Sequence, residues 1–236
     1  MGEQSIVHSV LALIFLFLVG IAAIAAVFFT RGAGAMVAVV AGFIALVAFK
    51  VWKSFVARHA RGIAVTIVVG WVAACLLITA WLPFQPERPR DGSTVWQKLT
   101  FQQWSGSVRL SQYREMWGLL ADHPVRGAGL AGYPIAIQQY KEKQDVETFV
   151  YPHNLLLAVW SELGLLGLLI FLVLLIVFFT RAFATWRSAS IIAAMCALLI
   201  FGLVDIPTFK NDLAIQFWTL LALGTLPLVP TREFSP

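Results

Sequence analysis

The chain has 236 residues, of which 60% are hydrophobic, and its mean hydropathy is +0.83. Only 12% of its residues are charged, whereas roughly a quarter are charged in a soluble domain. This composition excludes an ordinary soluble domain and indicates an integral membrane protein. The net charge is +5, but the basic residues are dispersed among apolar runs. Because they form no continuous stripe, a nucleic-acid-binding function is not expected.

Apolar runs long enough to cross about 30 Å of hydrocarbon recur along the chain. They predict an all-α fold, a polytopic bundle of about six transmembrane helices. The spans are expected at residues 10–29, 33–49, 63–82, 154–179, 189–206 and 213–229. The first run has no basic leader and no small-residue cleavage site, so it is interpreted as a retained span. Cys75 and Cys196 lie inside two of the other runs without metal-ligand spacing and are interpreted as helix-packing residues.

Basic residues in the short loops predict the orientation of the chain. Lys50, Lys53, Arg58 and Arg61 cluster in one connection that contains no acidic residue. Short loops rich in lysine and arginine stay in the cytoplasm, so this connection is expected on the inner side. The resulting division is helices one to three at 1–82, an outer periplasmic loop at 83–153, helices four to six at 154–230 and a cytoplasmic tail at 231–236.

The outer loop contains an amphipathic helical pattern. Apolar residues recur at spacings of three and four, and Pro124 ends the pattern. These residues are Leu110, Tyr113, Trp117 and Leu120. We expect this helix to lie along the membrane surface. A second, polar stretch at about 134–143 is also compatible with a helix.

Two arginines on the outer side are candidates for binding an anion. Arg31 lies in a short turn between two spans, where it either snorkels to the interface or meets an anionic headgroup. Arg109 opens the amphipathic helix. It is either simply solvated there or joins the backbone N–H donors of the helix N-terminus in binding a phosphate.

His153 stands at the start of span four beside Asn154. It is either a capping or interfacial residue or a general base that acts on a membrane-anchored substrate. Glu162 lies deeper in the same apolar helix, where a carboxylate is costly, so a buried arginine or polar group is expected to pair with it. His123 precedes Pro124 and is interpreted first as part of a helix stop followed by a tight turn.

No metal-ligand motif and no nucleotide-binding loop is found in the outer loop, so no metal site and no cofactor is predicted.

The order and spacing of several motifs resemble the O-antigen ligase and polymerase family over about residues 25–210. The motifs are Thr30-Arg31-Gly32-Ala33, Arg109-Leu110 with Tyr113, Asp122-His123-Pro124, Gly127-Ala128-Gly129, His153-Asn154-Leu155 and Glu162-Leu163-Gly164. Members of this family usually have about a dozen spans, so the chain resembles their C-terminal half. One expectation is that another chain supplies the N-terminal half.

The resemblance implies a metal-independent glycosyltransferase of the C type at the periplasmic face of the bacterial inner membrane. Its donor would be a glycan on undecaprenyl pyrophosphate. The acceptor would be lipid A-core in a ligase, or another lipid-linked glycan in a polymerase. The family's functional residues match Arg31, Arg109 and His153. The arginines would hold the pyrophosphate, and the histidine would accept the proton of the attacking hydroxyl. The supporting residues would be Asn154, Glu162 and His123.

Three functions stay open at this point. An O-antigen ligase is the first expectation. A polymerase or a protein-glycosylating relative follows, because these enzymes share the motifs and differ in the acceptor. The third is a non-catalytic fragment that binds membrane lipids carrying a polyprenyl pyrophosphate.

Overall fold

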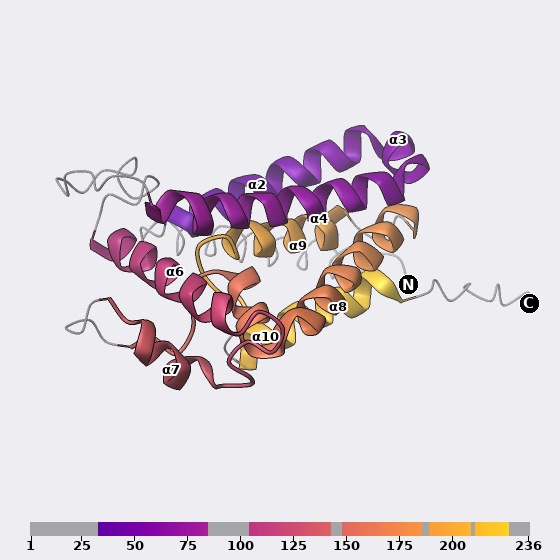
Figure 1. Ribbon diagram of the computed structural model, residues 1–236. Coiled ribbons are helices and arrows are strands. Elements are labelled where there is room, and N and C mark those ends of the chain that lie inside the picture. The colour runs from indigo at the N-terminus through magenta and orange to yellow at the C-terminus, as the bar shows by residue number, and fades with distance from the viewer. Residues whose placement is uncertain (1–32, 85–103, 143–147, 186–188, 209–210, 227–236) are drawn as a thin grey trace, which may run out of the picture.

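The computed structural model describes residues 33–84, 104–142, 148–185, 189–208 and 211–226 (Figure 1). Within these ranges every regular element is a helix. In chain order they are α2 (Ala33–Val51), α3 (Lys53–Arg58), α4 (Ala60–Leu76), η1 (Leu77–Trp81), η2 (Leu82–Phe84), α6 (Trp104–Asp122), α7 (Tyr133–Ala136), η3 (Ile137–Tyr140), α8 (Leu155–Thr185), α9 (Ala189–Phe201) and α10 (Asn211–Thr225).

Three described helices are long and apolar enough to cross a membrane, namely Gly34–Val51, Ala60–Trp81 and Leu155–Ala184. The apolar helices α9 and α10 are shorter. These five helices coincide with predicted spans two to six, which confirms the predicted helical membrane bundle. The predicted first span at 10–29 lies outside the described residues.

The membrane helices pack in pairs. α2 packs against α9, α4 packs against α8, and α10 contacts both α8 and α9. In Figure 1, α8 runs obliquely to α4. Trp71 of α4 links the pairs, because its indole Nε1 donates a 2.7 Å hydrogen bond to the carbonyl of Leu199 on α9. Cys75 is buried and free and Cys196 is partly buried and free, which fits the packing role predicted for both.

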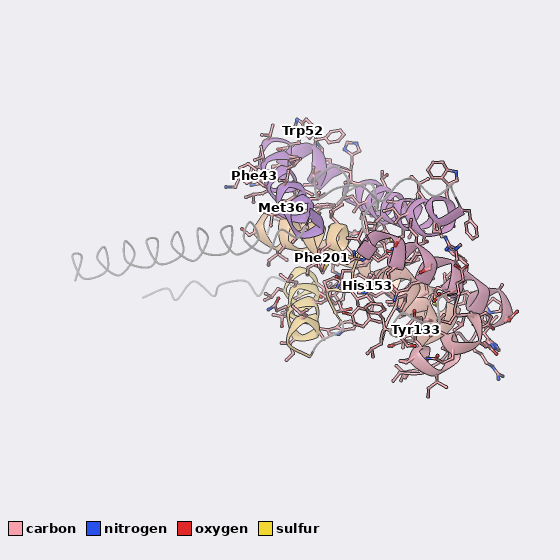
Figure 2. The ribbon with its side chains drawn as sticks, turned by 90° about the vertical axis from the view of Figure 1, so that its left-hand side faces the viewer. Met36, Phe43, Trp52, Tyr133, His153 and Phe201 are labelled. Atoms are coloured by element: carbon pink, nitrogen blue, oxygen red, sulfur yellow. The ribbon has the colours of Figure 1, made fainter. Side chains whose placement is uncertain are left out.

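One face of α2 is apolar and exposed. Val40, Phe43 and Ile44 are 58%, 66% and 61% exposed, as lipid-facing side chains should be when no membrane is present. Figure 2 shows Phe43 and Trp52 at the side of the molecule away from Tyr133.

The predicted amphipathic helix is confirmed as α6, which ends before Pro124. The prediction that Arg109 opens this helix is wrong, because α6 begins at Trp104 and Arg109 lies beyond its first turn, away from the free N–H donors of the N-terminus. Polar as well as apolar side chains of α6 are buried in the protein. The buried apolar residues of the unit that α6 forms with α7, η3 and the start of α8 are Tyr113, Met116, Leu119, Leu120, Tyr133, Ile137 and Leu157. The stretch predicted at 134–143 forms the short helices α7 and η3. That α6 lies along the membrane surface remains a prediction.

α8 is interrupted at Gly164. This residue has φ 68° and ψ −175°, a conformation that glycine adopts at little cost and other residues rarely do. The next residue, Leu165, donates its backbone N–H to the carbonyl of Val125 at 2.9 Å instead of continuing the helical ladder. Predicted span four is therefore two helical segments joined at a break.

The loop after α6 docks against this break. The carbonyl of Ser161 accepts hydrogen bonds from the backbone N–H groups of Ala128 at 2.7 Å and Gly129 at 3.2 Å. Gly127 has φ 61°, and a Cβ there would collide with the carbonyl oxygen of Ser161. The loop backbone thus replaces hydrogen bonds that α8 gives up, and Gly127 is required for its close approach.

Candidate functional site

Three segments that are distant in the sequence form the candidate site: the first half of α6, residues 153–155 at the start of α8, and the turn at 202–206 after α9. Figure 2 shows His153 between Phe201, at the C-terminal end of α9, and Tyr133, on α7. His153 and Asn154 are hydrogen-bonded to the other two segments, and an ion pair between Arg109 and Asp205 joins α6 to the turn.

Tyr113 attaches His153 to α6. Its phenol Oη donates a 2.6 Å hydrogen bond to the backbone carbonyl of His153. The ring is fully buried, and this burial raises the pKa of the hydroxyl against the opposing effect of the Arg109 charge. Tyr113 therefore stays protonated and keeps its role as a donor.

Asn154 attaches the start of α8 to the turn after α9. Its side-chain oxygen accepts a hydrogen bond from the backbone N–H of Leu157 at 3.1 Å, which caps the helix. Its amide nitrogen donates to the carbonyl of Leu203 at 2.9 Å. Next to it, the backbone N–H of Leu155 donates to the carbonyl of Gly202 at 2.8 Å. The buried Asn154 thus fixes the position of its neighbour His153.

Asp205 lies between two of the three side chains predicted to carry the chemistry, His153 and Arg109. Its Oδ1 lies 3.2 Å from Nδ1 of His153, and its Oδ2 lies 4.0 Å from Nη2 of Arg109. Burial raises the pKa of the Asp205 carboxyl, but the hydrogen bonds from His153 and from the backbone N–H of Ile206, together with the Arg109 charge, outweigh it. The net result is a pKa below the usual range.

An ionised carboxylate only accepts hydrogen bonds, so Asp205 requires the proton of His153 to be on Nδ1. This leaves Nε2 as the basic nitrogen. The side chain of His153 is 13% exposed, and the rings of Phe149 and Tyr151 stand edge-on to it at centroid distances of 5.1 and 5.2 Å. The imidazole is thus fixed in both tautomer and orientation.

Arg109 keeps unused hydrogen-bonding capacity. Its side chain is 28% exposed, and its Nη2 is too far from Asp205 for a hydrogen bond. Its Nε is buried and has no hydrogen-bond partner among the described residues. A guanidinium with free donors matches the geometry of a phosphate group.

The other predicted site residues differ in their placement. Arg31 lies outside the described residues, so its approach to Arg109 and His153 stays a prediction. His123 is exposed, and its carbonyl accepts the backbone N–H of Gly127 at 2.9 Å, which fits the predicted helix stop and turn. Glu162 is half-buried near the break in α8, and the described residues offer its carboxylate no hydrogen bond or ion pair. Its expected partner is therefore not found among them.

Asp205 was not among the predicted site residues, and Tyr113 was placed only in the apolar pattern of the amphipathic helix and in the family motif with Arg109. A signal for Asp205 was present, because it ends an apolar run in which an unpaired carboxylate is costly. Which residue would pair with it was not visible, because His153 lies 52 residues away. Within the part of the chain that the structure describes, no three His, Cys, Asp or Glu side chains form a group suited to a metal ion.

The comparisons with known proteins place the chain in a family. The family model described as O-antigen ligase matches residues 17–172, which is more than half of the chain. The match includes Arg31, Arg109 and His153 and ends before Asp205. Neither the curated proteins nor the solved structures contain a significant match. The chain is therefore a membrane protein that belongs to the O-antigen ligase family.

Proposed function

We propose that this protein is a glycosyltransferase that moves a glycan from undecaprenyl pyrophosphate to lipid A-core, as an O-antigen ligase. The arrangement of Arg109, Asp205 and His153 carries the proposal. It combines a guanidinium with free donors and an imidazole held in one tautomer by a carboxylate. The family supports the reaction type, and the apolar helices support a reaction at a membrane.

The proposed reaction uses His153 as the general base. Its Nε2 accepts the proton of the attacking acceptor hydroxyl while the oxygen forms a bond to the anomeric carbon of the donor. The bond between that carbon and the pyrophosphate oxygen breaks, and the configuration at carbon inverts. Asp205 stabilises the imidazolium that forms, as a carboxylate does beside a catalytic histidine in other enzymes.

The leaving pyrophosphate gains negative charge as its bond breaks. Arg109 would stabilise this charge with Nε and its other guanidinium donors, none of which is hydrogen-bonded to Asp205. Arg31 would supply the second positive charge. The reaction would take place at the periplasmic face of the bacterial inner membrane, within a helix bundle of the glycosyltransferase C type, and without a metal ion or cofactor.

The test is transfer in a bacterial host that lacks its own ligase. The parent and its Arg31→Ala, Arg109→Ala and His153→Ala variants are compared by lipopolysaccharide gel at equal membrane expression. The parent should give a ladder that all three variants lose. Arg126→Ala is the matched control, because this exposed arginine lies in the loop that docks on α8 and should leave the ladder unchanged.

The outcomes separate the alternatives. A linear glycan that stays on the polyprenyl lipid would identify a polymerase and contradict the ligase. A well-expressed parent that binds the donor lipid but forms no product would identify a lipid-binding protein and contradict any transferase. A ladder that survives His153→Ala would contradict the proposed base.

A further inference from the structure

Gln112 of α6 is buried, but its side-chain oxygen is unused. The residue is 5% exposed, and its Oε1 has no hydrogen-bond partner among the described residues. Together with Nε of Arg109 it makes up the set of buried side-chain nitrogen and oxygen atoms that lack a partner there. Because buried polar atoms are nearly always paired in native proteins, such an atom needs an explanation, and a ligand that supplies the missing partner is one.

The two unpaired atoms belong to one face of α6. Arg109 and Gln112 are three residues apart, and side chains at this spacing are neighbours on a helix, with about 5–6 Å between their Cβ atoms. The following residue, Tyr113, is hydrogen-bonded to His153. Gln112 therefore lies about one helical turn from Arg109, the proposed phosphate-binding residue. It is also adjacent in sequence to Tyr113, which is hydrogen-bonded to the proposed base, His153.

The chemistry of the two atoms is complementary. Nε–H of Arg109 donates a hydrogen bond, whereas Oε1 of Gln112 only accepts one. An ionised phosphate has no proton to give, so it suits Arg109 and cannot pair with Oε1. A ligand group that pairs with Oε1 must carry an O–H or N–H group. The helical spacing puts it near the group that Arg109 would bind.

We propose that Gln112 binds the sugar that is bonded directly to the pyrophosphate, through a hydrogen bond from a hydroxyl or acetamido N–H group of that sugar to Oε1. This inference rests on the proposed function and deepens it. Arg109 would recognise the pyrophosphate, which all such donors share. Gln112 would distinguish a lipid that carries a sugar from the lipid that remains after transfer.

The test compares binding of two lipids to the full-length protein in detergent: undecaprenyl pyrophosphate and the same lipid carrying one N-acetylglucosamine. Gln112→Met removes the acceptor at nearly constant volume. It should weaken binding of the sugar-bearing lipid about tenfold, the ratio that corresponds to about 1.4 kcal/mol, and leave binding of the sugar-free lipid unchanged. Arg109→Ala should weaken binding of both lipids.

Ser111→Ala is the matched control. Ser111 is a neighbouring buried polar residue of α6 whose Oγ is already bonded to the carbonyl of Val108 at 2.9 Å, so neither affinity should change. Retained affinity for the sugar-free lipid also shows that Gln112→Met is folded. If Gln112→Met fails to fold, Gln112→Asn, which keeps the amide but moves it back by one methylene, should show the same selective loss.

The outcomes distinguish this inference from the proposed function. Equal binding of both lipids by the parent, or an equal change for both lipids in the Gln112 variants, overturns the role of Gln112 alone. A parent that binds neither lipid overturns the proposed function, and this inference with it.

Discussion

Two arginines of α6 carry the same group and use it differently. Arg114 donates from Nε and Nη2 to the carboxylate of Glu142 at 2.7–3.0 Å and from Nη1 to the carbonyl of Pro83 at 2.8 Å. Arg109 comes no nearer than 4.0 Å to Asp205, and its Nε has no partner among the described residues. Arg114 ties three segments together, whereas Arg109 retains donors for a ligand. The difference shows that the role of a charged side chain is indicated less by its charge than by whether its hydrogen-bond donors are already paired.

The largest expected effect is on transfer. Arg109→Ala should lower the rate per folded molecule by about 100-fold or more, as the loss of one well-placed donor to a developing negative charge does in other enzymes. Arg114→Ala should leave that rate within about twofold. The measurement is transfer to lipid A-core by purified protein, normalised to the folded fraction. Equal losses in the two variants would remove the distinction between the arginines.

Asp205→Asn should also lower the rate, because the amide can still accept the hydrogen bond from His153 but carries no charge to stabilise the imidazolium. Its effect on stability depends on pH. The folded-state pKa of Asp205 lies below the usual range, so its stabilising contribution is present above that range and is lost as the pH falls through the folded-state value. The melting temperatures of parent and variant should therefore converge in acid. If the difference between the two melting temperatures grew in acid, the lowered pKa of Asp205 would be contradicted.

Arg114→Ala should act on stability. The side chains of Arg114 and Glu142 are 24% and 40% exposed, so solvent screens the pair and its coupling is expected at about 1 kcal/mol or less. A double-mutant cycle with Glu142→Ala, measured by thermal unfolding, isolates this value. The coupling should shrink at high salt. A coupling that is independent of salt would show that packing, and not charge, holds these segments together.

The smallest expected effect is a gain. Burial raises the pKa of Glu115, and the nearby Glu142 carboxylate adds to this, against the hydrogen bond from the Glu142 backbone N–H. A folded-state pKa above the unfolded value costs stability at neutral pH, and the cost disappears as the pH falls below the unfolded value. Glu115→Gln keeps the acceptor and should raise the melting temperature by about a degree or two at pH 7, with no gain in acid. If Glu115→Gln lowered the melting temperature at pH 7, the destabilising effect of the buried Glu115 carboxylate would be contradicted.

Much of the architecture follows from local patterns. The apolar runs predicted the membrane helices, because in lipid only a helix satisfies its own backbone. The spacing from Leu110 to Leu120 predicted α6, and Pro124 marked its end. These features depend on residues within a few turns of each other, so one sequence is enough to find them.

The remaining features depend on contacts between distant residues. The break at Gly164 lies in an apolar run that looks like one continuous helix, and the loop at 124–129 that stabilises it is distant in the sequence. The pairing of His153 with Asp205 requires that α8 and α9 fold back on each other. The local pattern could therefore suggest the histidine and Arg109 but not the carboxylate that connects them.

The turn after α9 has a consequence for the biosynthesis of the protein. His153 meets its carboxylate, and Asn154 its partner Leu203, only after about 50 further residues have been added to the chain. At about 5–20 residues per second this takes several seconds, during which α8 and α9 must also enter the membrane. A nascent chain that ends inside α9 carries the imidazole without Asp205. Its basic nitrogen is therefore fixed only after the turn at 202–206 has been translated.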